Sequence, residues 1–288
     1  MPVGVGIAML VRVRNTMEPL GMIAGNGEFP LILAHSARRA GVERIVAAAF
    51  EGETKPEMQD AVDELEWVKL GQLNKLIEVF TSRGIKRAVM AGGITPSNLF
   101  KNLRLDLRMT AVAFRLKERN AETIFGAIAL EMAKDGVALL DPRPFLGDAV
   151  PQAGVLTNQK PSKEQRADIE FGLKIAKAVS ALDIGQTVVV KKGTVLAVEG
   201  FEGTNDCIHR GGALAGEDGA AVVVKVSKPN QDFRFDIPCI GVNTIESCRA
   251  SRIAVLAIEA GRGLLLNQEK LLEAANANKL CIVATAHE

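Results

Sequence analysis

Short apolar runs and amphipathic segments alternate along the chain between residues 19 and 140. The run Leu20–Ala24 ends at Gly25-Asn26-Gly27, and apolar residues then recur at helical spacing over Pro30–Ala40. The same alternation predicts strand Arg44–Phe50, strand Leu65–Leu70, helix Leu73–Phe80, strand Arg87–Ala91, helix Glu122–Lys134 and strand Val137–Leu140. Strands that alternate with helices are typical of parallel sheets, so we expect a Rossmann-like parallel α/β domain.

The pattern breaks between Leu140 and Gln165, where four of the eleven prolines lie. We therefore expect an N-terminal extension over 1–18, a first domain over 19–150 and a second domain over 151–288. A long amphipathic helix over Lys163–Leu182 opens the second domain, and a hairpin around Lys191-Lys192-Gly193 follows. Further elements are predicted as strand 221–226, helix 245–252, strand 253–258, helix 268–277 and strand 280–284. Hairpins mixed with helices indicate a mixed α/β (α+β) fold.

Composition narrows the classes of function. The 288 residues suit two domains, and 35 basic against 34 acidic residues leave a net charge of +1. Proteins that bind nucleic acid in bulk usually carry a clear basic excess, so we expect no nucleic-acid partner. With eleven Phe, one Trp and no Tyr, the core is expected to be aliphatic. The four cysteines form no CxxC pair, which favours buried thiols over a zinc site.

Membrane contact is suggested by charge rather than by hydropathy. The most apolar N-terminal run, Val3–Val13, is too short to cross a bilayer. Lys101–Arg119 carries six basic and two acidic residues, a local net charge of +4. Such a segment is either a solvated helix face or a surface that holds phosphates or anionic lipid.

Two glycine-rich turns close predicted strands of the first domain. Gly25-Asn26-Gly27 lies between a strand and a helix, where backbone amides can hold a phosphate, but Pro30 occupies the place of the third glycine of the dinucleotide fingerprint. Glu51 and Glu53 lie loosely where a ribose-binding acid would be. Gly92-Gly93 closes another strand, so the two turns could flank one crevice. Both a tight turn and a nucleotide site remain open interpretations.

Carboxylates concentrate in the second domain. Glu199, Glu202 and Asp206 surround Gly203-Thr204-Asn205. Downstream, Lys228–Pro238 alternates polar and apolar residues. As a strand it would place Asp232, Arg234 and Asp236 on one face, with the two aspartates about 13 Å apart. A Mg²⁺ ion would then need one of them plus an acid from another segment. A surface strand with Asp–Arg ion pairs is the alternative.

The motifs together resemble those of the LpxI family of UDP-2,3-diacylglucosamine pyrophosphatases. The resemblance covers about residues 19–285 and rests on the order of individually weak motifs, namely Gly21-Met22-Ile23-Ala24-Gly25-Asn26-Gly27, Met90-Ala91-Gly92-Gly93, Leu182-Asp183-Ile184-Gly185-Gln186, Leu196-Ala197-Val198-Glu199, Glu202-Gly203-Thr204, Lys228-Pro229, Asp236-Ile237-Pro238 and Ile240-Gly241.

The resemblance implies a metal-dependent hydrolase of lipid A biosynthesis, with its site between two domains. It would split UDP-2,3-diacylglucosamine into UMP and 2,3-diacylglucosamine 1-phosphate (lipid X). The family's critical aspartate corresponds to Asp236, which we expect to bind Mg²⁺ or Mn²⁺ or to orient water. Glu202 and Asp206 are the expected additional metal ligands. Asn205 replaces a family aspartate, which weakens the assignment of ligands in that element.

The remaining expected roles follow from the charge on a pyrophosphate and from the substrate's acyl chains. Lys225, Lys228 or Arg234 would stabilise phosphate charge beside Asp236. The expected substrate-binding residues are Gly25, Gly27, Gly92, Gly93, Gly203, Thr204 and Lys225. We also expect an apolar cleft, a cytoplasmic protein in transient contact with the inner membrane, and a homodimer. The alternatives are a nucleotide- or NAD-binding oxidoreductase and a non-catalytic module on the membrane surface.

Overall fold

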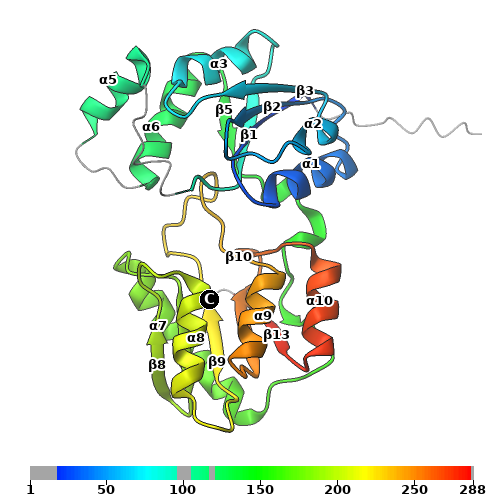
Figure 1. Ribbon diagram of the computed structural model, residues 1–288, viewed down its shortest axis with the longest axis vertical. Coiled ribbons are helices and arrows are strands. Elements are labelled where there is room, and N and C mark those ends of the chain that lie inside the picture. The colour runs from blue at the N-terminus through cyan, green and yellow to red at the C-terminus, as the bar shows by residue number, and fades with distance from the viewer. Residues whose placement is uncertain (1–17, 96–104, 117–120, 287–288) are drawn as a thin grey trace, which may run out of the picture.

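The computed structural model describes residues 18–95, 105–116 and 121–286. Two α/β bodies lie one above the other along the long axis, and a segment of the second reaches up to the first (Figure 1). The expected extension 1–18 falls outside the described residues except for Glu18, and so do the ends of the basic segment 101–119.

The first domain contains a five-stranded, all-parallel sheet in the order β3-β2-β1-β4-β5, which confirms the predicted Rossmann-like arrangement. Its central strands are buried along their length because helices cover both faces. The strands are β1 Leu20–Ala24, β2 Ile45–Phe50, β3 Glu64–Val68, β4 Arg87–Ala91 and β5 Ala138–Leu140. The helices are α1 Phe29–Arg39, α2 Met58–Ala61, α3 Leu73–Thr81, α5 Leu107–Arg115 and α6 Ala121–Lys134.

The second domain contains a six-stranded mixed sheet in the order β6-β13-β11-β9-β7-β8, as the mixed α/β prediction requires. The predicted hairpin is the antiparallel pair β7–β8. A capping box between Ser162 and Gln165 starts α7. The connecting 3-10 turns are η1 Arg143–Phe145 and η2 Gly147–Ala149. The strands are β6 Gly154–Val155, β7 Thr187–Lys191, β8 Thr194–Val198, β9 Val222–Lys225, β10 Cys239–Ile240, β11 Val255–Glu259, β12 Leu264–Leu265 and β13 Cys281–Thr285, and the helices are α7 Lys163–Ala181, α8 Thr204–Leu214, α9 Val242–Ala250 and α10 Gln268–Ala277.

The second domain differs from the prediction at a turn and at a helix, and its short strands β6, β10 and β12 were not predicted either. Residues 232–238 form a turn rather than a strand, because the backbone N–H of Phe235 donates to the Asp232 carbonyl at 3.1 Å and bends the chain. Helix α8 was not predicted, since its glycines resemble loop residues. They serve packing instead: a Cβ on Gly211 would lie 2.5 Å from Val189.

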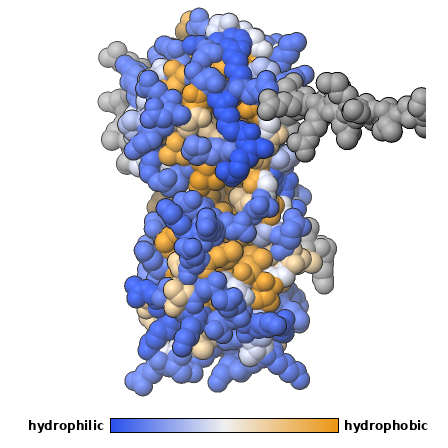
Figure 2. All heavy atoms as spheres, turned by 90° about the vertical axis from the view of Figure 1, so that its right-hand side faces the viewer, coloured by the Kyte–Doolittle hydropathy of each residue, from blue (hydrophilic) through white to orange (hydrophobic). Residues whose placement is uncertain are grey.

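The core is aliphatic, as the composition predicts. Among the described residues, the buried aromatic side chains are Phe80, Phe145 and Phe233. All four cysteines are free thiols, and burial raises the pKa of Cys207 and of Cys248 to about 12. No helix in the described part of the chain is long and apolar enough to span a bilayer. Hydrophilic side chains cover most of the face in Figure 2, while apolar ones show in patches on both bodies and around the narrow zone between them.

Candidate active site

The segment Lys228–Cys239 carries the candidate catalytic residues from the second domain to the first. Phe233 and Ile237 pack into a core cluster on one face of the first sheet, together with residues of α1. Phe235 packs against the cluster that contains residues of α3, α5 and α6. The turn is therefore fixed to the first domain by its apolar side chains, although its chain ends belong to the second.

The two glycine-rich turns of the first domain lie against each other. The backbone N–H of Gly25 donates to the Ala91 carbonyl at 2.7 Å, and that of Asn26 donates to the Gly93 carbonyl at 2.8 Å. This contact confirms that both turns flank one crevice. A Cβ on Gly25 would lie 2.3 Å from the Gly93 carbonyl oxygen, and one on Gly92 would lie 2.3 Å from that of Asn26. Close backbone packing thus accounts for these two glycines without a ligand.

Glu53 ties the two turns together. It is 8% exposed, and its Oε2 accepts hydrogen bonds from Asn26 Nδ2 at 3.1 Å, Thr95 N at 3.0 Å and Thr95 Oγ1 at 2.9 Å. A ribose-binding acid would need its carboxylate directed toward a ligand. These contacts give Glu53 a structural role, which counts against the dinucleotide interpretation of this turn.

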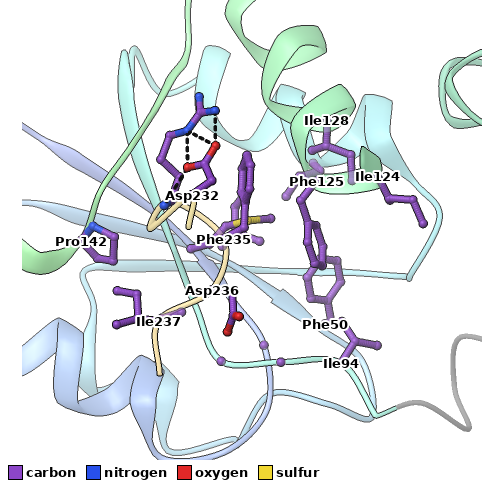
Figure 3. Close-up of a pocket in the computed structure, with 18 of the residues that line it drawn as sticks. Phe50, Ile94, Ile124, Phe125, Ile128, Pro142, Asp232, Phe235, Asp236 and Ile237 are labelled. Carbon is purple, nitrogen blue, oxygen red and sulfur yellow. Dashed lines mark hydrogen bonds and ion pairs between the residues drawn. The ribbon is translucent and has the colours of Figure 1, made fainter. Parts of the chain in front are cut away.

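A cavity of about 650 Å³ opens between the glycine turns, the helices α3, α5 and α6, and the turn of residues 232–237. One wall is apolar, formed by Phe50, Phe125 and Phe235 with neighbouring isoleucines (Figure 3). Polar groups lie along the opposite wall, which includes Asp232 and Asp236. Gly25, Gly92 and Gly93 also line the cavity, whereas Gly27 does not.

Asp236 is exposed, and two side-chain amides orient its carboxylate. Its Oδ2 accepts hydrogen bonds from Gln186 Nε2 at 3.3 Å and from Gln231 Nε2 at 3.0 Å. Gln231 Nε2 also donates to the Asp236 carbonyl, which fixes the amide relative to the turn. Neither glutamine was predicted to have a role. The Asp-Ile-Gly-Gln motif was the available signal for Gln186.

Hydrogen bonds connect Asp236 to two of the predicted substrate-binding residues. The Gln186 backbone N–H donates to Glu199 Oε2 at 3.3 Å, and Thr204 Oγ1 donates to Glu199 Oε1 at 2.9 Å. Lys225 Nζ in turn donates to Thr204 Oγ1 at 2.8 Å. Thr204 begins α8, and Gly203 caps that helix with a φ of 88°. The positive end of α8 and the Lys225 ammonium group thus lie at one end of this network.

Glu202 and Asp206 line a separate hollow with Gly203, Thr204, Asn205 and Thr244, and Thr204 is the residue that it shares with the hydrogen-bond network of Asp236. Arg210 pairs with Glu202 and holds the pKa of that carboxyl below its usual range. Among the described residues, no three His, Cys, Asp or Glu side chains are placed to hold one metal ion. The structure therefore does not bring Asp236, Glu202 and Asp206 together as one set of metal ligands.

Two of the three cations predicted to stabilise phosphate charge, Lys228 and Arg234, already have acidic partners. Arg234 pairs with Asp232 at 2.6 Å, and this contact lowers the pKa of the Asp232 carboxyl. Lys228 pairs with Asp183. The Asp–Arg ion pair that the sequence offered as an alternative is thus present, within a turn instead of along a strand.

Comparison with known proteins identifies the family. Residues 19–149 match the model of the LpxI N-terminal domain, and residues 152–283 match that of the LpxI C-terminal domain. The UDP-2,3-diacylglucosamine pyrophosphatase LpxI of Caulobacter vibrioides is 30% identical over 270 residues, which cover 90% of this chain and 95% of that protein.

The likeness to two solved structures is low. The biotin carboxylase domain of Hydrogenobacter thermophilus 2-oxoglutarate carboxylase has a TM-score of 0.26 and 12% identity, over 69% of this chain and 42% of that one. N5-carboxyaminoimidazole synthetase of Staphylococcus aureus has a TM-score of 0.23 and 12% identity, over 70% and 45%. The two domain matches and the full-length relative show that this chain belongs to the LpxI family.

Proposed function

We propose that this protein hydrolyses the pyrophosphate of UDP-2,3-diacylglucosamine to give UMP and 2,3-diacylglucosamine 1-phosphate, a step of lipid A biosynthesis. One observation carries the proposal. The carboxylate of Asp236, which two side-chain amides orient, borders a cavity whose opposite wall is apolar. The name of the Caulobacter relative supplies the substrate.

The apolar wall suits the lipid part of that substrate. A cavity of about 650 Å³ lies in the usual range for ligand pockets, and its lining includes Ile124, Phe125 and Ile128 of α6. Burial of acyl methylenes there would contribute about 0.8 kcal/mol each. Hydride transfer to a nicotinamide needs no such wall, so the oxidoreductase alternative receives less support.

The polar residues suit hydrolysis of the anhydride. Asp236 would accept a proton from the attacking water or hold it in line with the scissile bond. Lys225 and the N-terminus of α8 would stabilise negative charge on the phosphates. Lys228 and Arg234 would contribute once phosphate oxygens compete with their present partners, Asp183 and Asp232.

The residues at the cavity fit a divalent ion that is held by a single protein carboxylate. Mg²⁺ sites that act on phosphates often use one or two carboxylates, with phosphate oxygens and water as the other ligands. Asp236 would be the protein ligand, while Glu202 and Asp206 lie at the separate hollow. When bound, such an ion would neutralise phosphate charge and lower the pKa of a bound water.

Release of UMP tests the function and the metal requirement together. We expect the purified protein to release UMP from UDP-2,3-diacylglucosamine with Mg²⁺ or Mn²⁺, and to lose this activity in EDTA. Restoration by added metal controls for damage by the chelator. A folded protein that releases no UMP with any divalent ion would refute the proposed function, whereas activity in EDTA would refute only the metal requirement.

We also propose that the protein is cytoplasmic and works as a homodimer.

We propose further that it meets its lipid substrate at the inner membrane through α5. Leu107 and Phe114 are 92% and 84% exposed and lie seven residues apart, on one face of the helix. The nearby Leu130 of α6 is 69% exposed. Other residues of the same two helices line the cavity, so an acyl chain would have a short apolar route from bilayer to cavity. Arg115 and Lys134, at the C-terminal ends of these helices, both pair with Glu131, so anionic lipid would have to compete with that carboxylate for them.

Acidic substitutions on α5 test the membrane contact. We expect the double variant Leu107→Glu, Phe114→Glu to bind vesicles of phosphatidylethanolamine and phosphatidylglycerol at least about tenfold more weakly, because two apolar contacts are lost and two negative charges added. Phe201→Glu is the control, since Phe201 is fully exposed on the second domain. Equal vesicle binding by the wild type and both variants in sedimentation assays would contradict the contact.

A further inference from the structure

Two guanidinium groups lie over the ring of Phe233, three residues before Asp236. Arg143 Cζ is 3.6 Å from the ring centroid, and Arg262 Cζ is 4.8 Å from it. The phenylalanine is 9% exposed. A guanidinium within about 6 Å of an aromatic centroid is attracted to the ring face, and the attraction grows when water is excluded. Both arginines are thus fixed to the ring in a largely dry setting.

The arginines belong to different parts of the chain. Arg143 starts the connector η1, directly after the last strand of the first sheet. Arg143 Nη2 lies 2.5 Å from Asp141 Oδ2, and Arg143 Nη1 donates to the Gly261 carbonyl at 2.8 Å. Arg262 follows β11 of the second domain and donates to Ser227 Oγ at 2.6 Å and to the Lys228 carbonyl at 3.2 Å. Phe233 therefore joins the connector to the second-domain loop.

A buried carboxylate fixes the base of the same segment. Glu259 is 2% exposed, pairs with Lys177 at 2.6 Å and accepts hydrogen bonds from Ser227 N at 2.6 Å and Ser227 Oγ at 2.8 Å. Burial opposes ionisation of Glu259, but the contacts with Lys177 and Ser227 outweigh it and lower its pKa. The chain thus leaves β9 from an anchored point before it enters the catalytic turn.

We propose that Arg143 and Arg262 are positioning residues for Asp236, and that they act through Phe233. The turn from Asp232 to Asp236 is closed by a backbone hydrogen bond from Phe235 N to the Asp232 carbonyl, so a shift of the ring moves the carboxylate. Because one arginine follows the first sheet and the other lies in the second domain, the contact makes the position of Asp236 depend on how the domains meet. The inference rests on the proposed function for its catalytic consequence.

Two variants remove the stacking while keeping charge or apolar volume. Arg143→Lys retains a cation without the planar group, and Phe233→Leu retains an apolar side chain without the π face. For each we expect kcat for UMP release to fall about 10- to 100-fold, with KM changed less than about threefold, because catalysis depends on sub-ångström placement. Phe233→Tyr keeps the ring and should restore most of kcat. Arg249→Lys, an exposed arginine on α9, is the matched control.

Amide hydrogen exchange provides a readout that does not need turnover. We expect faster exchange confined to residues 231–237 in Arg143→Lys and Phe233→Leu, with the rest of the chain unchanged. Wild-type kcat and exchange in both variants would overturn the inference, and so would a raised KM with unchanged kcat. If the wild type releases no UMP, the proposed function fails, while the exchange data still decide whether the arginines position the turn.

Discussion

Asp236→Asn is expected to reduce UMP release about 10²- to 10⁴-fold, the range typical for loss of a group that moves a proton or places a reacting water. The asparagine carbonyl can still accept hydrogen bonds from Gln186 and Gln231, so the turn should keep its shape. The variant loses the negative charge of the carboxylate. Asp236 needs that charge both to accept a proton from water and to bind a divalent ion. Steady-state assays at saturating Mg²⁺ would measure the loss.

The matched control is Asp218→Asn, which removes a surface carboxylate that pairs with Lys191 on the second domain. We expect it to retain activity within about twofold, since exposed ion pairs contribute little. Circular dichroism and thermal unfolding would establish that both variants are folded. If folded Asp236→Asn turns over at the wild-type rate, Asp236 is neither the base nor a required metal ligand.

Gly92→Ala is expected to lower the free energy of unfolding of the first domain by about 2–5 kcal/mol. The φ of Gly92 is +81°, a conformation that costs an L residue about 1–2 kcal/mol. The new Cβ would also lie 2.3 Å from the Asn26 carbonyl oxygen, and such overpacking typically costs about 1–3 kcal/mol more. Urea unfolding followed by Trp67 fluorescence reports on this domain, because Trp67 is the chain's single tryptophan and lies in β3.

Gly27→Ala separates the two contributions. Gly27 has a φ of +84°, but no atom lies within 4 Å of the position that an added methyl group would take, so only the conformational cost of about 1–2 kcal/mol applies. Equal destabilisation by the two substitutions would show that the close approach of the Gly92 Cβ to the Asn26 carbonyl adds no cost.

The first domain could be predicted well because its local patterns agree with its topology. The central strands of the first sheet are short apolar runs that end at turns, and the alternation of strands with helices predicts that they pair in parallel. That the two glycine turns could flank one crevice was also predictable, since the carboxyl ends of neighbouring parallel strands meet at one edge, but the hydrogen bonds between them were not. Strand ends shifted by a residue or two, as for Leu65–Leu70 against Glu64–Val68.

The turn at 232–238 could not be predicted from the period of its hydrophobic and polar residues alone. Its alternation of polar and apolar residues is typical of a strand, yet Phe233 and Phe235 pack into two different clusters of the first domain. A long-range contact therefore overrides the local pattern. Likewise, no local signal reports that Glu202 faces Arg210 while Asp236 faces Gln186, because these choices depend on how distant segments meet.

The insertion of residues 233–237 into the first domain has a consequence for biosynthesis. A ribosome completes the five strands of the first sheet when residue 140 has been added, but the side chains that fill its carboxyl edge come almost a hundred residues later. Until then the nascent domain exposes apolar surface that its own sequence does not cover. Translation of the second domain thus completes the core of the first, so residues 19–150 alone are not a self-sufficient folding unit.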